Sequence, residues 1–178
     1  SEGRSFDVTP QWLDRPIGKQ RFENAVADLT LHALSQSPGS ALVFLPGAGE
    51  IRRVAALLRN TLPSDCTLAP LFGALDFKTQ QAAIAPVKTG RKVVLATSIA
   101  ETSLTIEGIR IVVDGGRSRR ALFDPSSGMA RLVTERVTRA EATQRGGRAG
   151  RRDAGVGYKV WTRGEEGALA AYPPAEIV

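Results

Sequence analysis

The sequence predicts an α/β domain with an open, mostly parallel sheet flanked by helices and with a small β-hairpin insertion. Short apolar runs recur along the chain without polar alternation, which is typical of strands buried on both faces of a parallel sheet. Segments with helical apolar spacing lie between these runs, so strand and helix alternate. A chain of 178 residues with 42% hydrophobic and 24% charged residues is also long enough for one domain with a full core.

The expected elements follow from these patterns in chain order. Two helices are expected early in the chain because apolar residues recur there at helical spacing, forming one stripe in each helix. These stripes consist of Phe22, Val26, Leu29 and Ala33, and of Ile51, Val54, Ala55 and Leu58. Strands are expected at residues 41–45, 68–72, 92–97, 109–114 and 157–161. The sequence FDPSSG at residues 123–128 favours a turn, which predicts a β-hairpin between two short apolar runs.

Two flanking segments complete the expected organisation. Residues 1–18 are interpreted as a lead-in from a preceding domain, and residues 19–169 as the domain itself. Residues 170–178 are interpreted as an exit linker toward a following domain. The start at Ser1 suggests a piece of a longer chain.

Composition narrows the class of protein. No apolar run reaches the roughly 18 residues that a membrane span needs, and no signal-peptide pattern opens the chain. The single Cys66 cannot form an internal disulfide, which suits a reducing compartment, and the single His32 leaves little material for a metal site. We therefore expect a soluble, cytoplasmic protein with no membrane partner and no metal held by protein side chains alone.

The charge distribution points to an anionic partner. The net charge is +6 and the sequence pI is near 10.1, which favours binding to polyanions by counterion release. Ten arginines lie between residues 117 and 152, against three acidic residues in the same segment. A basic surface that merely faces solvent is the alternative reading of this charge.

The loops that follow the strands are the expected binding region. Ligands of open parallel sheets bind at the carboxyl ends of the strands, where the connecting loops gather. The loops concerned are PGAGE at residues 46–50, TSIAETSLT at residues 97–105 and GGRSRR at residues 115–120.

The segment QRGGRAGR at residues 144–151 is the most distinctive motif. Thr138 and Glu141 precede it at the spacing of a capping box, which predicts a helix that begins at Thr138. If the helix continues through residue 151, Gln144, Arg148 and Arg151 share one face, and the arginines can grip phosphate oxygens with their planar forks. The alternative is a flexible Arg-Gly tract that binds RNA without chemistry.

These residues give the chain a strong resemblance to the second RecA-like motor domain of superfamily 2 DEAH-box helicases, most closely to the bacterial HrpB group. QRGGRAGR resembles their motif VI, residues 96–116 (ATSIAETSLTIEGIRIVVDGG) resemble motif V with the strand that follows it, and residues 42–51 (LVFLPGAGEI) resemble motif IV. The resemblance implies a RecA-like fold. It covers nearly the whole chain.

The resemblance also implies roles for individual residues. Arg148 and Arg151 would reach the γ-phosphate of ATP that is bound on a partner RecA-like domain, and Gln144 would place the attacking water. Three residues would lie at the nucleotide, namely Ser103, Thr105 and Glu107. Four would contact the nucleic-acid backbone, namely Thr97, Ser98, Thr102 and Gly47. Without the family argument, hydroxyls such as those of Thr102, Ser103 and Thr105 could equally cap a helix or loop.

Two motifs of an NTPase are missing from this chain. Neither a GxxxxGK[ST] phosphate loop nor a DExH sequence occurs in it. The expected function is therefore the second motor domain of an ATP-dependent RNA helicase, inactive by itself. ATP with Mg²⁺ would be held mainly by the N-terminal RecA-like domain of the same parent chain, and single-stranded nucleic acid, most simply RNA, would be the other partner. The alternative is a non-catalytic RNA-binding or regulatory RecA-like module.

Overall fold

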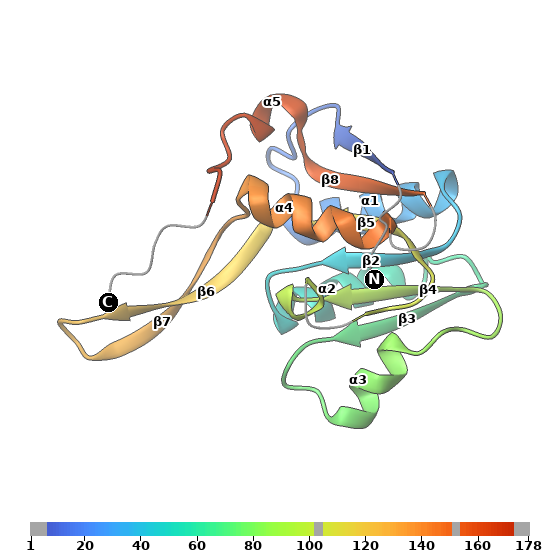
Figure 1. Ribbon diagram of the computed structural model, residues 1–178, viewed down its shortest axis with the longest axis horizontal. Helices are drawn as coiled ribbons and strands as arrows, with labels where there is room; N and C mark the ends of the chain where they lie inside the picture. The colour runs from blue at the N-terminus through green and yellow to red at the C-terminus, as the bar shows by residue number, and fades with distance from the viewer. Residues whose placement is uncertain (1–6, 102–104, 151–153, 173–178) are drawn as a thin grey trace.

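A parallel sheet forms the centre of the computed structural model, which describes residues 7–101, 105–150 and 154–172. Within these residues the sheet has six strands in the order β1-β8-β5-β2-β4-β3, with every neighbouring pair parallel (Figure 1). The strands are β1 (Val8–Leu13), β2 (Ser40–Phe44), β3 (Cys66–Leu71), β4 (Arg91–Ala96), β5 (Ile109–Asp114) and β8 (Gly155–Thr162). The five strands expected from the apolar runs are confirmed.

Strand β1 comes from the segment that the sequence analysis assigned to a lead-in. It pairs with β8 along one edge of the sheet, and several of its side chains are exposed. Pro10 lies within it, which an edge strand tolerates because one side of the strand makes no ladder hydrogen bonds.

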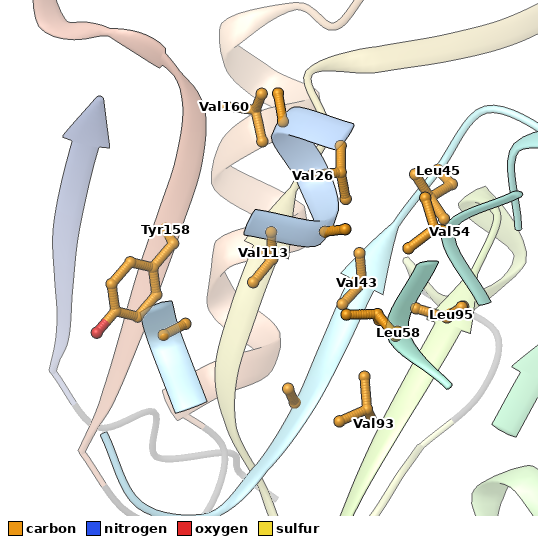
Figure 2. Packing of buried hydrophobic residues seen from close by; sticks show 14 of the residues in the cluster. Val26, Val43, Leu45, Val54, Leu58, Val93, Leu95, Val113, Tyr158 and Val160 are labelled. Atoms are coloured by element: carbon orange, nitrogen blue, oxygen red, sulfur yellow. The ribbon is translucent and has the colours of Figure 1, made fainter. Parts of the chain in front are cut away.

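Successive side chains of the buried strands point to opposite faces of the sheet, and both faces are covered by other elements. Helices α1 (Phe22–Gln36) and α2 (Ala48–Leu58) pack on one face, where Val43 of β2 and Val113 of β5 contribute to the core (Figure 2). On the opposite face, Phe44 packs with Ala83 of helix α3 (Phe77–Ile84) and with Ala149. Phe44 therefore lies on the face of the sheet that Ala149 of the motif covers.

The predicted hairpin is confirmed. Strands β6 (Arg117–Asp124) and β7 (Met129–Arg136) pair in antiparallel fashion and project well away from the sheet (Figure 1). The outer part of the hairpin carries large exposed apolar side chains, which are Leu122, Phe123, Met129 and Leu132.

The capping box at the start of the motif helix is also confirmed, but the helix is shorter than an α-helix through residue 151. Helix α4 (Arg139–Gly146) ends at the first glycine of the motif, and Gly147–Gly150 continue as the 3₁₀ helix η2. Three closely spaced glycines lower the helix propensity of this segment, which favours the change in winding. A further 3₁₀ turn, η1 (Ser98–Ala100), follows β4, and the short helix α5 (Arg163–Glu166) follows β8.

Candidate nucleotide and nucleic-acid interface

Arg145 is the centre of the site formed by the motif V and motif VI segments. Its side chain has no exposed surface, and its Nε donates a hydrogen bond to Glu101 Oε2 at 2.6 Å. Its Nη1 donates to Asp114 Oδ1 at 2.8 Å, and its guanidinium lies 5.0 Å from the centre of the Phe44 ring. Both Nη atoms also lie 3.3 Å from the backbone oxygen of Arg117. One buried side chain thus joins α4, the loop after η1, the end of β5 and the start of β6.

Arg148 reaches the same loop from η2. Its Nε donates a hydrogen bond to the backbone oxygen of Glu101 at 2.7 Å, and most of the residue is buried. Residues three apart lie on one side of a helical segment, which explains why Arg145 of α4 and Arg148 of η2 both point at Glu101. Gln144 is instead exposed. The predicted grouping of Gln144 with Arg148 on one face is therefore not what the shorter α-helix produces.

The electrostatics of this cluster keep its cation charged. Burial by itself would lower the pKa of Arg145, but Asp114 and Glu101 outweigh this effect and raise that pKa further. Burial raises the pKa of Glu101, and the attraction of Arg145 opposes the rise. The cluster is therefore an anchored guanidinium between two carboxylates that have little access to water.

A second cluster surrounds Gly47, at the N-cap of α2. Arg119 of the hairpin donates from Nη2 to Glu50 Oε2 at 2.8 Å and from Nε to Thr134 Oγ1 at 3.0 Å. The Nη1 atom of Arg119 occupies the space in which a Cβ at residue 47 would lie. The φ of Gly47 is −168°, which any residue adopts, so a larger residue here would have to displace only the flexible end of the Arg119 side chain.

The other predicted contact residues lie along the loop after β4. Thr97 directly follows the strand and is partly exposed, and Ser98 begins η1 and is exposed. Thr105 and Glu107 are exposed in the segment that leads into β5. Thr102, Ser103 and Arg151, which the sequence analysis placed at the nucleic acid or nucleotide, lie outside the described residues. Their predicted roles stay predictions.

Three functional candidates were missed by the sequence reasoning, and each had only a weak signal. Arg145 lies inside the motif, but the expected stripe was defined by Gln144 and the later arginines, so Arg145 was left beside it. Glu101 lies among the polar residues of the loop TSIAETSLT, where nothing distinguishes it from its neighbours. Arg119 stands in a segment of many arginines, so nothing in the sequence singled it out. Each of the three contacts a partner that is distant in the sequence, as Arg119 contacts Glu50.

The described residues also bear on metal binding and on membrane-spanning helices. No group of three or more His, Cys, Asp or Glu side chains among them is arranged to hold a metal ion. Within the same part of the chain, no helix is long and apolar enough to span a membrane.

The chain is similar to known proteins over most of its length. The family model described as the helicase conserved C-terminal domain matches residues 23–153. The ATP-dependent RNA helicase HrpB of Escherichia coli is 51% identical over 179 residues, which cover 100% of this chain and 22% of that protein. The pre-mRNA-splicing factor ATP-dependent RNA helicase prp22 of Schizosaccharomyces pombe is 38% identical, over 90% of this chain and 14% of its own length.

A solved structure agrees with the fold. The crystal structure of the E. coli DExH-box NTPase HrpB superposes with a TM-score of 0.91 at 50% identity, over 98% of this chain and 22% of that one. The predicted fold class and the resemblance to the HrpB group are both confirmed. This chain spans about a fifth of the length of HrpB.

Proposed function

The chain belongs to the helicase C-terminal domain family, and from this premise we propose that it is the second RecA-like motor domain of an ATP-dependent RNA helicase. In this role it supplies arginine fingers to ATP on a partner RecA-like domain, and half of the groove for nucleic acid. The observation that carries the proposal is the hydrogen bond from Arg148 Nε to the Glu101 backbone oxygen. It joins the proposed finger to the loop that would contact the nucleic acid.

The anchored Arg148 suits the work of a finger. Its guanidinium stays charged at any working pH, and fixing the Nε atom restricts the orientation of the planar fork. A positioned cation stabilises the negative charge that develops on phosphate oxygens during phosphoryl transfer. Arg151 would add a second cation, and the exposed amide of Gln144 would orient the attacking water.

The remaining residues present fit a nucleotide and a nucleic-acid strand. When bound, ATP with Mg²⁺ supplies the phosphoryl group, and the partner domain would hold most of it. On this chain, the exposed Glu107 carboxylate can accept hydrogen bonds from ribose hydroxyls, with Thr105 and Ser103 beside it in the sequence. The hydroxyls of Thr97, Ser98 and Thr102 can donate to backbone phosphates, which positions a strand without reading its sequence.

The organisation around the domain is part of the proposal. Residues 19–169 would form the motor domain, with residues 1–18 leading in from the P-loop domain and residues 170–178 leading out. Strand β1 then makes residues 8–13 of the lead-in a structural part of the sheet. We place the parent protein in the bacterial cytoplasm, which the single Cys66 and the similarity to an E. coli protein support.

The test is steady-state ATP hydrolysis by the parent protein, with and without single-stranded RNA. RNA should stimulate turnover of the wild type, and Arg148→Ala should lower the stimulated rate by about 10³-fold or more, as for other arginine fingers. Arg139→Ala is the matched control, because Arg139 is exposed on α4 of the same segment. Its rate should stay within about two-fold of the wild type.

Two results would contradict the proposed function. A parent protein that binds RNA but hydrolyses no ATP would support the non-catalytic RNA-binding or regulatory module. Equal rates for Arg148→Ala and Arg139→Ala would remove Arg148 from the catalytic machinery.

A further inference from the structure

We propose that Arg145 is a positioning residue that couples the nucleic-acid loop after β4 to the finger Arg148, so that RNA binding sets the rate of ATP hydrolysis. This inference rests on the proposed function and extends it to the regulation of the same site. Arg145 has no exposed side-chain surface, so it acts through the residues that it holds.

The coupling runs through Glu101, which is held at two points. Its carboxylate binds Arg145 at 2.6 Å, and its backbone oxygen accepts the hydrogen bond from Arg148 at 2.7 Å. The two arginines belong to one continuous helical segment, three residues apart. A displacement of Glu101 is therefore transmitted to both arginines together.

Glu101 is connected just as directly to the proposed nucleic-acid contacts. Its backbone N–H donates to the Ser98 oxygen at 2.9 Å, and the Ala100 N–H donates to the Thr97 oxygen at 3.2 Å. These bonds make residues 97–101 one rigid turn. A strand that binds Thr97 and Ser98 would therefore set the place of Glu101.

The other contacts of Arg145 provide the fixed reference for this movement. Asp114 ends a strand in the middle of the sheet, and its Oδ1 accepts a second hydrogen bond, from the Gly116 N–H at 2.8 Å. Phe44 lies under the guanidinium at the end of the neighbouring strand. Arg145 thus ties Glu101, at the end of the turn after β4, to Asp114 at the end of a central strand.

The chemistry of the contacts explains why the residue is an arginine. The planar guanidinium holds donors on separate nitrogens in a fixed geometry, and here they reach two carboxylates on separate elements. Lysine keeps the charge but has a single nitrogen. Apolar residues often replace a buried ion pair without loss of stability, so these buried charges are better explained by the geometry they impose than by stability.

The experiment uses the parent protein with Arg145→Lys, and a 20-nucleotide oligouridylate as the RNA probe. Three quantities are measured, namely the ATPase rate with and without RNA, the affinity for the RNA, and the thermal unfolding midpoint. We expect the ratio of stimulated to basal rate to fall by about ten-fold, within the usual range of coupling between sites, and the RNA affinity to change by less than about three-fold. Arg139→Lys, on the exposed side of the same helix, should match the wild type.

A double variant tests whether Arg145 acts through Arg148. The rate of Arg145→Lys combined with Arg148→Ala should equal that of Arg148→Ala alone, because the finger that Arg145 positions is already gone. Multiplying losses, or an unchanged stimulation ratio in Arg145→Lys, would overturn the proposal and leave Arg145 a purely structural residue. If Arg145→Lys does not fold, Glu101→Gln decides between the same outcomes because it keeps the shape of the side chain.

The wild type separates this proposal from the one on which it rests. A wild-type protein without RNA-stimulated hydrolysis would overturn both proposals. Stimulation in the wild type that is lost in Arg148→Ala but retained in Arg145→Lys would overturn the coupling role alone.

Discussion

Glu166 gathers the polar ends of three side chains at one oxygen. Its Oε1 accepts hydrogen bonds from Trp12 Nε1 at 2.9 Å, Lys159 Nζ at 2.9 Å and Trp161 Nε1 at 3.1 Å. Both indole N–H groups are thereby satisfied inside the domain rather than offered to bases. Because Trp12 belongs to the edge strand β1, this carboxylate also fastens that strand to β8 and α5.

The Glu166 contacts predict how stability depends on pH. Partial burial would raise the pKa of Glu166, but the hydrogen bonds from Trp12, Lys159 and Trp161 outweigh it and hold the pKa below 4.5. A lowered carboxyl pKa contributes stability above pH 4.5 that is lost as the pH falls through the folded-state pKa. Glu166→Gln should therefore cost on the order of 1 kcal/mol at pH 7 and lose less stability than the wild type on acidification.

Urea unfolding at pH 7, 5 and 3.5 measures this difference. Glu135→Gln, which breaks the ion pair of Glu135 with Arg120 in the hairpin, shows what the loss of a single ion pair costs. If the unfolding free energies of the wild type and Glu166→Gln change in parallel with pH, the hydrogen bonds from the three donors to the ionised carboxylate add no stability.

Two glycines near the motif should respond oppositely to alanine. A Cβ on Gly155 would collide with the backbone oxygen of Ala149, where β8 crosses η2, and backbone cannot move cheaply. Gly155→Ala should lower the unfolding free energy by about 1 to 3 kcal/mol, the usual cost of overpacking. A Cβ on Gly146, at the end of α4, would meet nothing within 4 Å, so Gly146→Ala should raise it by up to about 1 kcal/mol.

Chemical denaturation of both variants beside the wild type measures these changes. If Gly146→Ala is destabilising, the change from α-helix to 3₁₀ helix at this residue depends on glycine. A neutral Gly155→Ala would mean that η2 and β8 can separate without cost.

At the scale of elements, α4 depends on its first turn. Thr138 accepts from the Glu141 N–H at 3.1 Å, while the Glu141 carboxylate accepts from the Thr138 N–H at 2.8 Å. The N–H groups of Arg139 and Ala140 donate to the backbone oxygens of residues 170 and 171. The start of α4 is therefore fixed by its two capping side chains and by residues 170 and 171, which follow α5.

Removing the cap should loosen the whole motif helix. Thr138→Ala should cost about 1 kcal/mol of unfolding free energy, because the Glu141 N–H loses the acceptor that the buried Thr138 provides. Thr143→Ala on the same helix is the matched control and should stay within about 0.5 kcal/mol, since Thr143 is exposed. Thermal melts compare the two variants. Equal midpoints would show that the contacts of residues 170 and 171 suffice to hold α4.

The apolar periodicity of the sequence predicted the elements that bury a continuous apolar face. It missed the elements that have apolar and polar residues on the same face. The central strands and the first two helices have the burial that their sequence implies. Helix α3 buries only Ala83, and β1 has exposed residues beside a proline, so neither has a clear apolar signal. The motif helix was located by its cap, but its side-chain directions depend on winding that a 3.6-residue period does not describe.

The charge of the whole molecule is partly neutralised within the fold. Among the described residues, several arginines of the basic segment form ion pairs, namely Arg119 with Glu50, Arg120 with Glu135, Arg136 with Glu165, and Arg145 with Glu101 and Asp114. Arg117 lies 4.0 Å from the centre of the Phe22 ring. The ten arginines counted in the sequence therefore overstate the number of cations that can meet a strand at once.

This difference is measurable in the salt dependence of RNA binding by the 178-residue chain. The slope of log K against log salt for a single strand is about −0.7 per phosphate neutralised, so two to four contacts predict a slope of roughly −1.4 to −2.8. Ten contacts, one for each arginine between residues 117 and 152, predict a slope near −7 by the same relation. Fluorescence anisotropy with a labelled oligouridylate between 50 and 200 mM KCl distinguishes these slopes. A steep slope would mean that the internal ion pairs open on binding, and would favour the Arg-Gly tract over a groove of fixed contacts.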